Sequence, residues 1–401
     1  MDPEHSAHIE RIDLPGSLEG KGYKSEVVLL DEVRNLQDIS RSERTGNAFF
    51  DKSMSSSQKI DANLGGLSIA NIEKLTRSIL GTQPKIITGE IILAGTSGTD
   101  QLFDGRLRVD NVVISRPTGV AGEQAVIRRL SFDLFSHFEP FGAALAAYRR
   151  RDVEAARTVL RQIIAQGSIE DRKHALWLRA KLSGRLQEEA DLLEALQIDP
   201  DFHLALVALV DVKRRAGQLD EALALADRGI AANKESPYGY HEKGRVLRSQ
   251  RKLDEAIAQF ELACGQKQKY APCHNQIGEI MFIKQETAPR EDWVRIYRAA
   301  YESFIKAARI DGQHTWAHSN AAFAASLLGN NSDALSLINR AMFLDPNLLA
   351  NRIRHALILS KTGKKEDAVA FAKAILAENP GLYDMETVGW GSRPGMRQLL
   401  Q

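Results

Sequence analysis

The chain has 401 residues, of which 43% are hydrophobic and 26% charged, a composition that supports a folded core. Its 53 basic and 52 acidic residues leave a net charge of +1, so we expect no general attraction to nucleic acid or anionic lipid. No apolar run approaches the roughly 18–20 residues of a membrane span, and the first residues lack the pattern of a secretion signal. These features favour a cytoplasmic protein, or a membrane-associated one if an anchor precedes the sequence.

The first 135 residues are predicted to form a small α/β domain of two helices and about three strands. Apolar residues at helical spacing predict a first helix over 24–40, whose apolar face contains Val27, Leu30, Val33 (or Val28) and Leu36. A polar, Ser-rich loop is expected near 41–60, and a second helix over 69–80.

Short β-branched segments at 85–93, 102–109 and 112–115 predict a meander of strands. The stretch GTSGTD, at 95–100, joins the first two. It lacks the lysine of a phosphate-binding P-loop and precedes a strand, so a hairpin turn is the favoured interpretation. Residues 121–148 are predicted to return to helix.

The remainder of the chain repeats a phrase at intervals of 34 residues. One residue, small in most copies, marks the same place in each copy, at Ala155, Glu188 or Ala190, Ala222, Ala256, Ala300, Ala334 and Ala368. The step from Ala256 to Ala300 is ten residues longer than the period, which places an insertion at 284–293. Each copy contains two amphipathic segments, so the sequence predicts a series of paired helices.

The best copy, 237–270, has Gly244, Ala256, Phe260 and Ala263 at the positions that define the tetratricopeptide repeat, which it resembles. The resemblance implies an α+β protein, in which an all-α solenoid of about six to seven helical pairs occupies 136–382. The residues that follow, 383–401, are expected to cap the last pair.

A second resemblance concerns the N-terminal domain. GYKSEVVLLDEVRNL at 22–36 is similar to the opening of a poorly characterised α/β domain found in bacterial tetratricopeptide-repeat proteins. GLSIANIEKLTRSILG and ITGEIILAG, at 66–81 and 87–95, are similar to its later helix and strands. This resemblance implies no catalytic residues.

The repeat resemblance also implies a groove, lined by the first helix of each pair, that binds a segment of another protein. The residues at its lining positions are Arg214, Arg215, Tyr238, His241, Arg245, Arg248, Asn275, Glu279, Trp316 and Ser319. Because guanidinium groups bind carboxylates in pairs of hydrogen bonds, an acidic or C-terminal peptide segment is the expected ligand. The alternative for the arginines is a solvated charged face. Trp316 is either a partner anchor or, as its large size favours, a residue packed between helices.

No catalytic residue, cofactor or metal site is expected. His314 and His318 are four residues apart but lack the glutamate of a zinc-peptidase motif. Cys264 and Cys273 form no CxxC pair, so two reduced, buried thiols are expected. The sequence thus favours a non-enzymatic interaction scaffold, with self-association left open. The alternative is a regulator in a bacterial signalling or defence system, in which the α/β domain senses a small ligand and the repeats relay the signal.

Overall fold

The computed structural model describes residues 9–13, 28–29, 31–39, 87–266 and 269–379. The chain divides into two compact units, residues 1–205 and 206–401. Each unit is described by itself below. The predicted loop near 41–60, the predicted helix over 69–80 and the predicted C-terminal cap lie outside the described residues.

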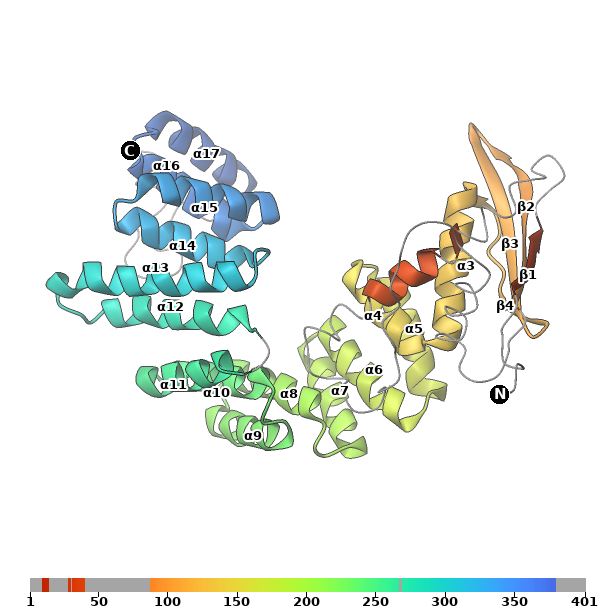
Figure 1. Ribbon diagram of the computed structural model, residues 1–401, viewed down its shortest axis with the longest axis horizontal. Helices are drawn as coiled ribbons and strands as arrows, with labels where there is room; N and C mark the ends of the chain where they lie inside the picture. The colour runs from red at the N-terminus through yellow and green to blue at the C-terminus, as the bar shows by residue number, and fades with distance from the viewer. Residues whose placement is uncertain (1–8, 14–27, 30, 40–86, 267–268, 380–401) are drawn as a thin grey trace, which may run out of the picture. The chain divides into compact units, whose positions relative to one another are not determined.

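A twisted sheet forms one side of the first unit (Figure 1). Its strands run in the order β1 (Ile9–Asp13), β2 (Ile87–Ser97), β3 (Asp100–Val109) and β4 (Val112–Ser115), and a short β5 (Val120–Ala121) also pairs with β3. Strand β1 is parallel to β2, and the other pairs are antiparallel. Strands β2 and β3 form the predicted hairpin, and Gly98, with φ of 61°, lies in its two-residue turn. The strand β1, too short to show a clear alternation, was not predicted.

Helix α3 (Glu123–Phe138) covers one face of this sheet. Residues that alternate along β2 and β3, such as Ile91 and Leu107, pack against Leu130 of α3. Gly105 permits this close approach, because a Cβ atom there would lie 2.6 Å from Val126 Cγ1. The described part of the first predicted helix joins the same core through Leu29, Val33 and Leu36, which confirms two of the residues expected on its apolar face.

Helical pairs follow the sheet, and the second helix of each pair lies antiparallel to the first. In the first unit they are α4 (Pro140–Arg149) with α5 (Val153–Gln166), and α6 (Ile169–Leu182) with α7 (Arg185–Ile198). Helix α8 (His203–Arg215) crosses the unit boundary and is followed by α9 (Leu219–Ala232). The second unit continues with α10 (Pro237–Ser249) and α11 (Leu253–Cys264), α12 (Ala271–Gln285) and α13 (Trp293–Ile310), α14 (Thr315–Leu327) and α15 (Asn331–Leu344), and α16 (Leu349–Lys361) and α17 (Lys365–Glu378). The segment 121–148, which was predicted to be helical, forms the two helices α3 and α4, because Pro140 cannot continue α3 and instead begins α4.

The 34-residue period corresponds to one helical pair. The aligned residue lies in the second helix of each pair. It is buried in the last five copies, at Ala222, Ala256, Ala300, Ala334 and Ala368, whereas Ala155 is half-buried and Ala190 is exposed in the first two. Glycine in the first helix lets the two helices approach, since a Cβ atom at Gly244 would lie 2.8 Å from the ring of Phe260. These contacts explain the small residues that recur in the sequence.

The inserted residues 284–293 lie at the tip of the pair α12 and α13. A short 3-10 helix (Arg290–Asp292) precedes α13, whose 18 residues make it longer than the 14-residue α15 (Figure 1). Trp293 donates its indole N–H to the carbonyl oxygen of Ala288 at 3.1 Å and closes the inserted loop on itself. The insertion therefore extends one end of the pair and leaves the interhelical contacts unchanged.

Candidate functional site

The first helices of successive pairs in the second unit place their polar side chains in one connected row. The 34-residue period brings the same helix position forward from pair to pair, as from Asp211 to Arg245 and from Arg245 to Glu279. We call these residues the A-helix face; its members on α8, α10, α12, α14 and α16 are Asp211, Arg214, Arg215, His241, Glu242, Arg245, Arg248, Asn275, Gln276, Glu279, Trp316, Ser319, Asn320 and Arg354.

Asp211 of α8 lies between three guanidinium groups. Its carboxylate accepts hydrogen bonds from Arg214 at 2.6 Å and Arg215 at 2.8 Å, and Arg245 of α10 lies 2.9 Å away. Burial alone would raise the pKa of the Asp211 carboxyl, but the three positive charges outweigh it, and the pKa is lower than usual. Asp211 therefore joins α8 to α10 as a carboxylate at neutral pH.

Arg245 also donates to both oxygens of buried Glu242, each at 2.9 Å. Burial would raise the pKa of Glu242, whereas the hydrogen bond from His241 and the charges of His241 and Arg245 lower it, and the net pKa is below the usual value. The His241 ring packs edge-on against Tyr270, with centroids 5.3 Å apart. His241 thus supports the carboxylate and the packing of α10 together.

The row continues through Arg248 of α10, which donates to Glu279 and Gln276 of α12, each at 2.7 Å. Glu279 accepts from the side-chain amide of Asn275 at 3.0 Å. Asn275 in turn accepts from Asn320 of α14 at 3.0 Å. Hydrogen bonds between side chains therefore link α10, α12 and α14 without interruption.

Arg354 of α16 ends the row in a different environment. It is buried and donates to the Ser319 hydroxyl at 2.8 Å, and its guanidinium lies 5.8 Å from the centroid of the Trp316 ring. Burial lowers the pKa of Arg354 to about 10, only partly offset by the charge of Glu279, so the group stays charged at neutral pH. Among the residues that the structure describes, no carboxylate lies within ion-pair distance of Arg354.

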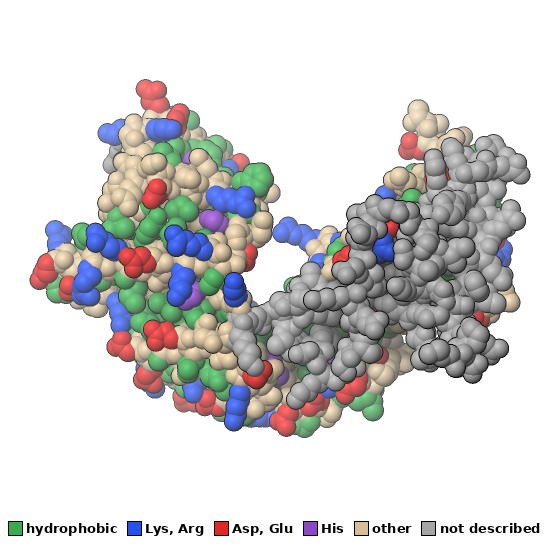
Figure 2. Space-filling model, in the orientation of Figure 1, with side chains coloured by type: hydrophobic (Ala, Val, Ile, Leu, Met, Phe, Trp, Pro, Cys, Tyr) green, Lys and Arg blue, Asp and Glu red, His purple; other side chains and the backbone are tan. Residues whose placement is uncertain are grey.

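The ten predicted groove residues all lie on the first helices of pairs, but the structure changes the interpretation of several. Trp316 is 43% exposed, so the favoured prediction that it packs between helices is wrong. The arginines do not form a freely solvated face, because Arg214, Arg245 and Arg248 are partly buried and bonded to carboxylates of the chain itself. In the view of Figure 2, basic, acidic and apolar side chains are interspersed over the described helices.

Sequence reasoning missed Glu242, Asn320 and Arg354 of the A-helix face, which occupy the same position of the repeat in three different pairs. In the repeat register each is the sixth residue of its first helix, counted from Pro237, Thr315 and Leu349. The sequence did contain a signal for these three residues, because a polar residue recurs immediately after an expected groove position. Asp211 was missed for another reason: it lies one period before Arg245 and so occupies an expected lining position itself.

A family model described as a tetratricopeptide repeat matches residues 141–201 and 207–271. The chain carries tetratricopeptide repeats.

Among solved structures, a chain of the APC/C hetero-tetramer Cut9–Hcn1 is 13% identical with a TM-score of 0.51, over 62% of this chain and 49% of that one. TTC0263 of Thermus thermophilus is 18% identical with a TM-score of 0.38, over 44% of this chain and 92% of that one. PilF of Pseudomonas aeruginosa is 14% identical with a TM-score of 0.40, over 60% of this chain and 91% of that one. No curated protein matches the chain, so the comparisons establish its repeat fold and not a specific activity.

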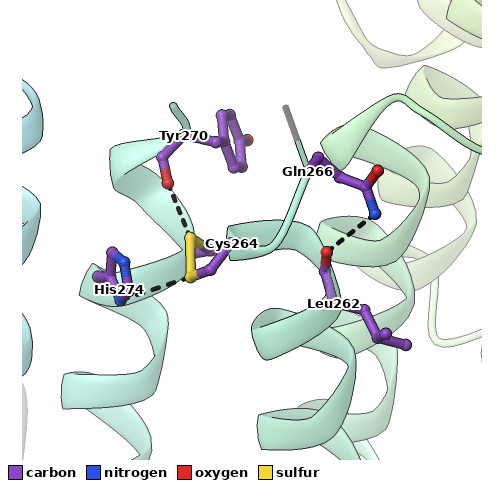
Figure 3. Close-up of a disulfide and its surroundings, with 6 residues drawn as sticks. Leu262, Cys264, Gln266, Tyr270 and His274 are labelled. Atoms are coloured by element: carbon purple, nitrogen blue, oxygen red, sulfur yellow. Dashed lines mark hydrogen bonds between the residues drawn. A yellow bond between two sulfur atoms is a disulfide. The ribbon is translucent and has the colours of Figure 1, made fainter. Parts of the chain in front are cut away.

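The two cysteines of this tetratricopeptide-repeat protein form a disulfide, so the prediction of two reduced thiols is wrong (Figure 3). The bond joins the last residue of α11 to the third residue of α12. The turn between consecutive repeats brings the two Cα atoms to 5.6 Å, which is a usual separation for a disulfide. Because this pairing depends on the turn between repeats, the search for a CxxC motif could not find it.

His314 and His318 have structural contacts in the repeat protein. The His314 ring accepts a hydrogen bond from the Ala317 N–H at 3.1 Å and caps the start of α14. His318 Nε2 lies 3.1 Å from the carbonyl oxygen of Gly312. Within the described ranges, no helix has both the length and the apolar character that a membrane crossing requires.

Proposed function

We propose that this repeat protein is a non-enzymatic scaffold that binds an acidic, extended segment of a partner protein on the A-helix face. Tetratricopeptide repeats generally serve as protein-interaction scaffolds, because their stacked helices present a continuous surface and no reactive groups of their own. The proposal concerns the ligand and its place on this chain.

The observation that carries the proposal is the environment of Arg354. A buried guanidinium has lost most of its hydration, and a carboxylate partner compensates best for that loss. Ser319, a neutral group, is its hydrogen-bond partner in the structure. Glu279 acts on Arg354 only through its charge, without an ion pair. A peptide carboxylate that approaches Arg354 from the side of the exposed Trp316 would add negative charge there, which makes an acidic side chain or a terminal carboxylate the ligand that fits best.

Trp316 provides the second element of the proposal. Its exposed ring lies at the start of α14, on the same face as Ser319 and near Arg354. Exposed aromatic rings next to arginine are the residues that most often anchor protein partners. An acidic segment with an apolar residue beside its carboxylate would therefore contact Arg354 and Trp316 together.

The test measures binding of labelled acidic octapeptides to the whole chain by fluorescence anisotropy. Each peptide is compared with an isosteric Asn/Gln version and with a C-terminal amide. We expect the acidic peptides to bind at least about 10-fold more tightly than the neutral ones, and to weaken as salt is added. Equal binding of acidic and neutral peptides would reject the proposal.

The α/β domain supports a second candidate function, the binding of a small anionic ligand. A polar depression of about 480 Å³ lies beside β4 and α3, and Arg116, Arg129, Asp133 and His137 are among its lining residues. Arg129 is paired with Asp133 at 3.0 Å, so a phosphate or carboxylate group would bind chiefly through Arg116. A thermal-shift screen of the whole chain against nucleotides and inorganic phosphate tests this function, because a ligand that binds the folded state raises its melting temperature. The absence of any shift at millimolar ligand would argue against it.

A further inference from the structure

A cluster of sulfur and nitrogen atoms lies where α11 meets α12 (Figure 3). The sulfur atoms of Cys264 and Cys273 and a ring nitrogen of His274 all lie within 4.8 Å of one another. Cys264 Sγ is 3.4 Å from His274 Nδ1. Cys273 is fully buried, whereas Cys264 and His274 are half-buried. Among the described residues, this is the group of three or more such side chains that is close enough to hold one metal ion.

We propose that, once the disulfide is reduced, Cys264, Cys273 and His274 bind a single thiophilic cation of the zinc class. Reduction requires a dithiol, which transfers two electrons and two protons to the disulfide and becomes a disulfide itself. The two new thiols release their protons to solvent as the cation binds, so each sulfur coordinates as a thiolate. Disulfide and bound metal therefore exclude each other.

The geometry requires little movement beyond separation of the two sulfurs. In tetrahedral zinc sites, Zn–S distances of about 2.3 Å and Zn–N distances of about 2.0 Å place ligand atoms about 3.5 Å apart. The backbone already holds the two cysteines with Cα atoms 5.6 Å apart. Cys273 is the third residue of α12, where the unpaired backbone N–H groups of a helix start favour a thiolate.

The fourth coordination position would open onto a surface depression. Cys264 and His274 line this depression, which has a volume of about 890 Å³, together with residues of α11 and α13. Glu261 lies one helical turn before Cys264 and also lines it, so a carboxylate or a water can fill the fourth position. Lys269, Lys306 and Arg309 add positive charge there, which the two thiolates and Glu261 offset.

The experiment uses the whole chain, reduced with a dithiol that is then removed without oxygen. Zinc affinity is measured by competition with a chromophoric chelator, and cobalt is added in parallel as a spectroscopic probe. We expect one zinc per reduced chain and none per oxidised chain. We also expect thiolate-to-cobalt charge-transfer absorption in the near ultraviolet. Reduced protein that takes up no zinc, or oxidised protein that takes up as much, would overturn the proposal.

Single substitutions distinguish zinc binding at this site from nonspecific binding of zinc to thiols. Cys264→Ser and His274→Gln should each weaken zinc binding by at least about 100-fold, which is more than is usual for a residue that only hydrogen-bonds to a ligand. His318→Gln is the matched control and should leave the affinity unchanged, because its ring contacts a backbone carbonyl instead. Circular dichroism verifies that the variants fold. If a variant does not fold, the cobalt spectrum of the reduced natural chain decides alone, and a spectrum without the thiolate band counts against the site.

Discussion

Asp211 illustrates how single residues determine the chemistry of the A-helix face. One carboxylate contacts three guanidinium groups on two helices, so its charge stabilises both the fold and the arrangement of the arginines. Arginines that the sequence presents as candidates for capturing a partner are thus held in place by the chain's own acids. Double charge reversal at Arg245 and Arg248 would place new carboxylates beside Asp211 and Glu279, and would disturb folding as well as binding.

We predict that Asp211→Asn lowers the free energy of unfolding by about 1–3 kcal/mol at pH 7, since it removes a partly buried charged partner. The pKa of Asp211 is lower in the folded state than in the unfolded state. Its stabilising effect is therefore fully present above the usual aspartate pKa of about 3.9, and is lost as the pH falls through the lowered folded value. Urea unfolding of both proteins between pH 7 and pH 3 measures this change.

Asp254→Asn is the matched control for that experiment. Asp254 also joins neighbouring helices, through Lys284, but its side chain is exposed. Its substitution should change stability by less than about 0.5 kcal/mol at any of these pH values, as is usual for surface ion pairs. A difference for Asp211→Asn that stayed constant down to pH 3 would contradict the assigned charge interaction.

Trp316 gives a second prediction at this scale. Trp316→Ala should weaken the binding of an acidic peptide about 10-fold or more, while the fold is retained because 43% of the residue is exposed. Phe343→Ala on α15 is the control, since Phe343 is 77% exposed and also lies beside an arginine, Arg340. Peptide anisotropy with both variants measures the effect. Equal loss of affinity in the two would exclude Trp316 as the anchor.

The residues that line the face were predictable, but their partners were not. Periodicity places Arg245, Arg248 and Glu279 on the correct helices because one 34-residue step maps one pair onto the next. Which arginine bonds which acid depends on side-chain contacts between neighbouring pairs. The exposure of Trp316 was unpredictable for the same reason, since residue size alone favours burial.

At the scale of elements, two neighbouring helical pairs are each held together by a glycine facing a phenylalanine. Gly278 of α12 faces Phe304 of α13 in the same way as Gly244 of α10 faces Phe260 of α11. The two glycines are one period apart, so the same contact occurs in both of these pairs. Repetition of the small residue made the pairs predictable from sequence, and Pro140 was a local signal for the end of α3, whereas the extra length of β2 depends on its pairing with β3.

We predict that Gly278→Ala lowers the free energy of unfolding by about 1–3 kcal/mol, because an added Cβ atom would lie 2.5 Å from the Phe304 ring. Gly312→Ala is the comparison, since a Cβ atom there meets nothing within 4 Å and its backbone needs no positive φ. Urea unfolding should show the loss for Gly278→Ala alone. Similar midpoints for the two variants would show that the helices separate without cost.

At the scale of the whole molecule, the two units have separate cores. The cluster on the sheet and the cluster around Leu160 and Leu178 lie in the first unit, and the clusters around Phe260, Phe304, Ile338 and Ile375 lie in the second. In repeat arrays each pair depends chiefly on its neighbours. A boundary between units is invisible to sequence periodicity, since the period passes through it.

We therefore predict that a fragment starting at His203 folds without the preceding residues. Its far-ultraviolet circular dichroism should show helix content close to that calculated for residues 203–379, with a cooperative thermal transition. The matching fragment that ends at Asp201 should retain the sheet core. A C-terminal fragment that is unfolded at neutral pH would show that the second unit requires the first.

The loop between α12 and α13 provides a practical opportunity. Ten additional residues are already accommodated there, outside the contact between Gly278 and Phe304. A short epitope or a fluorophore attached at Thr287 should consequently report on peptide capture without obstructing it. The same position offers a route for immobilising the protein on a biosensor in a defined orientation.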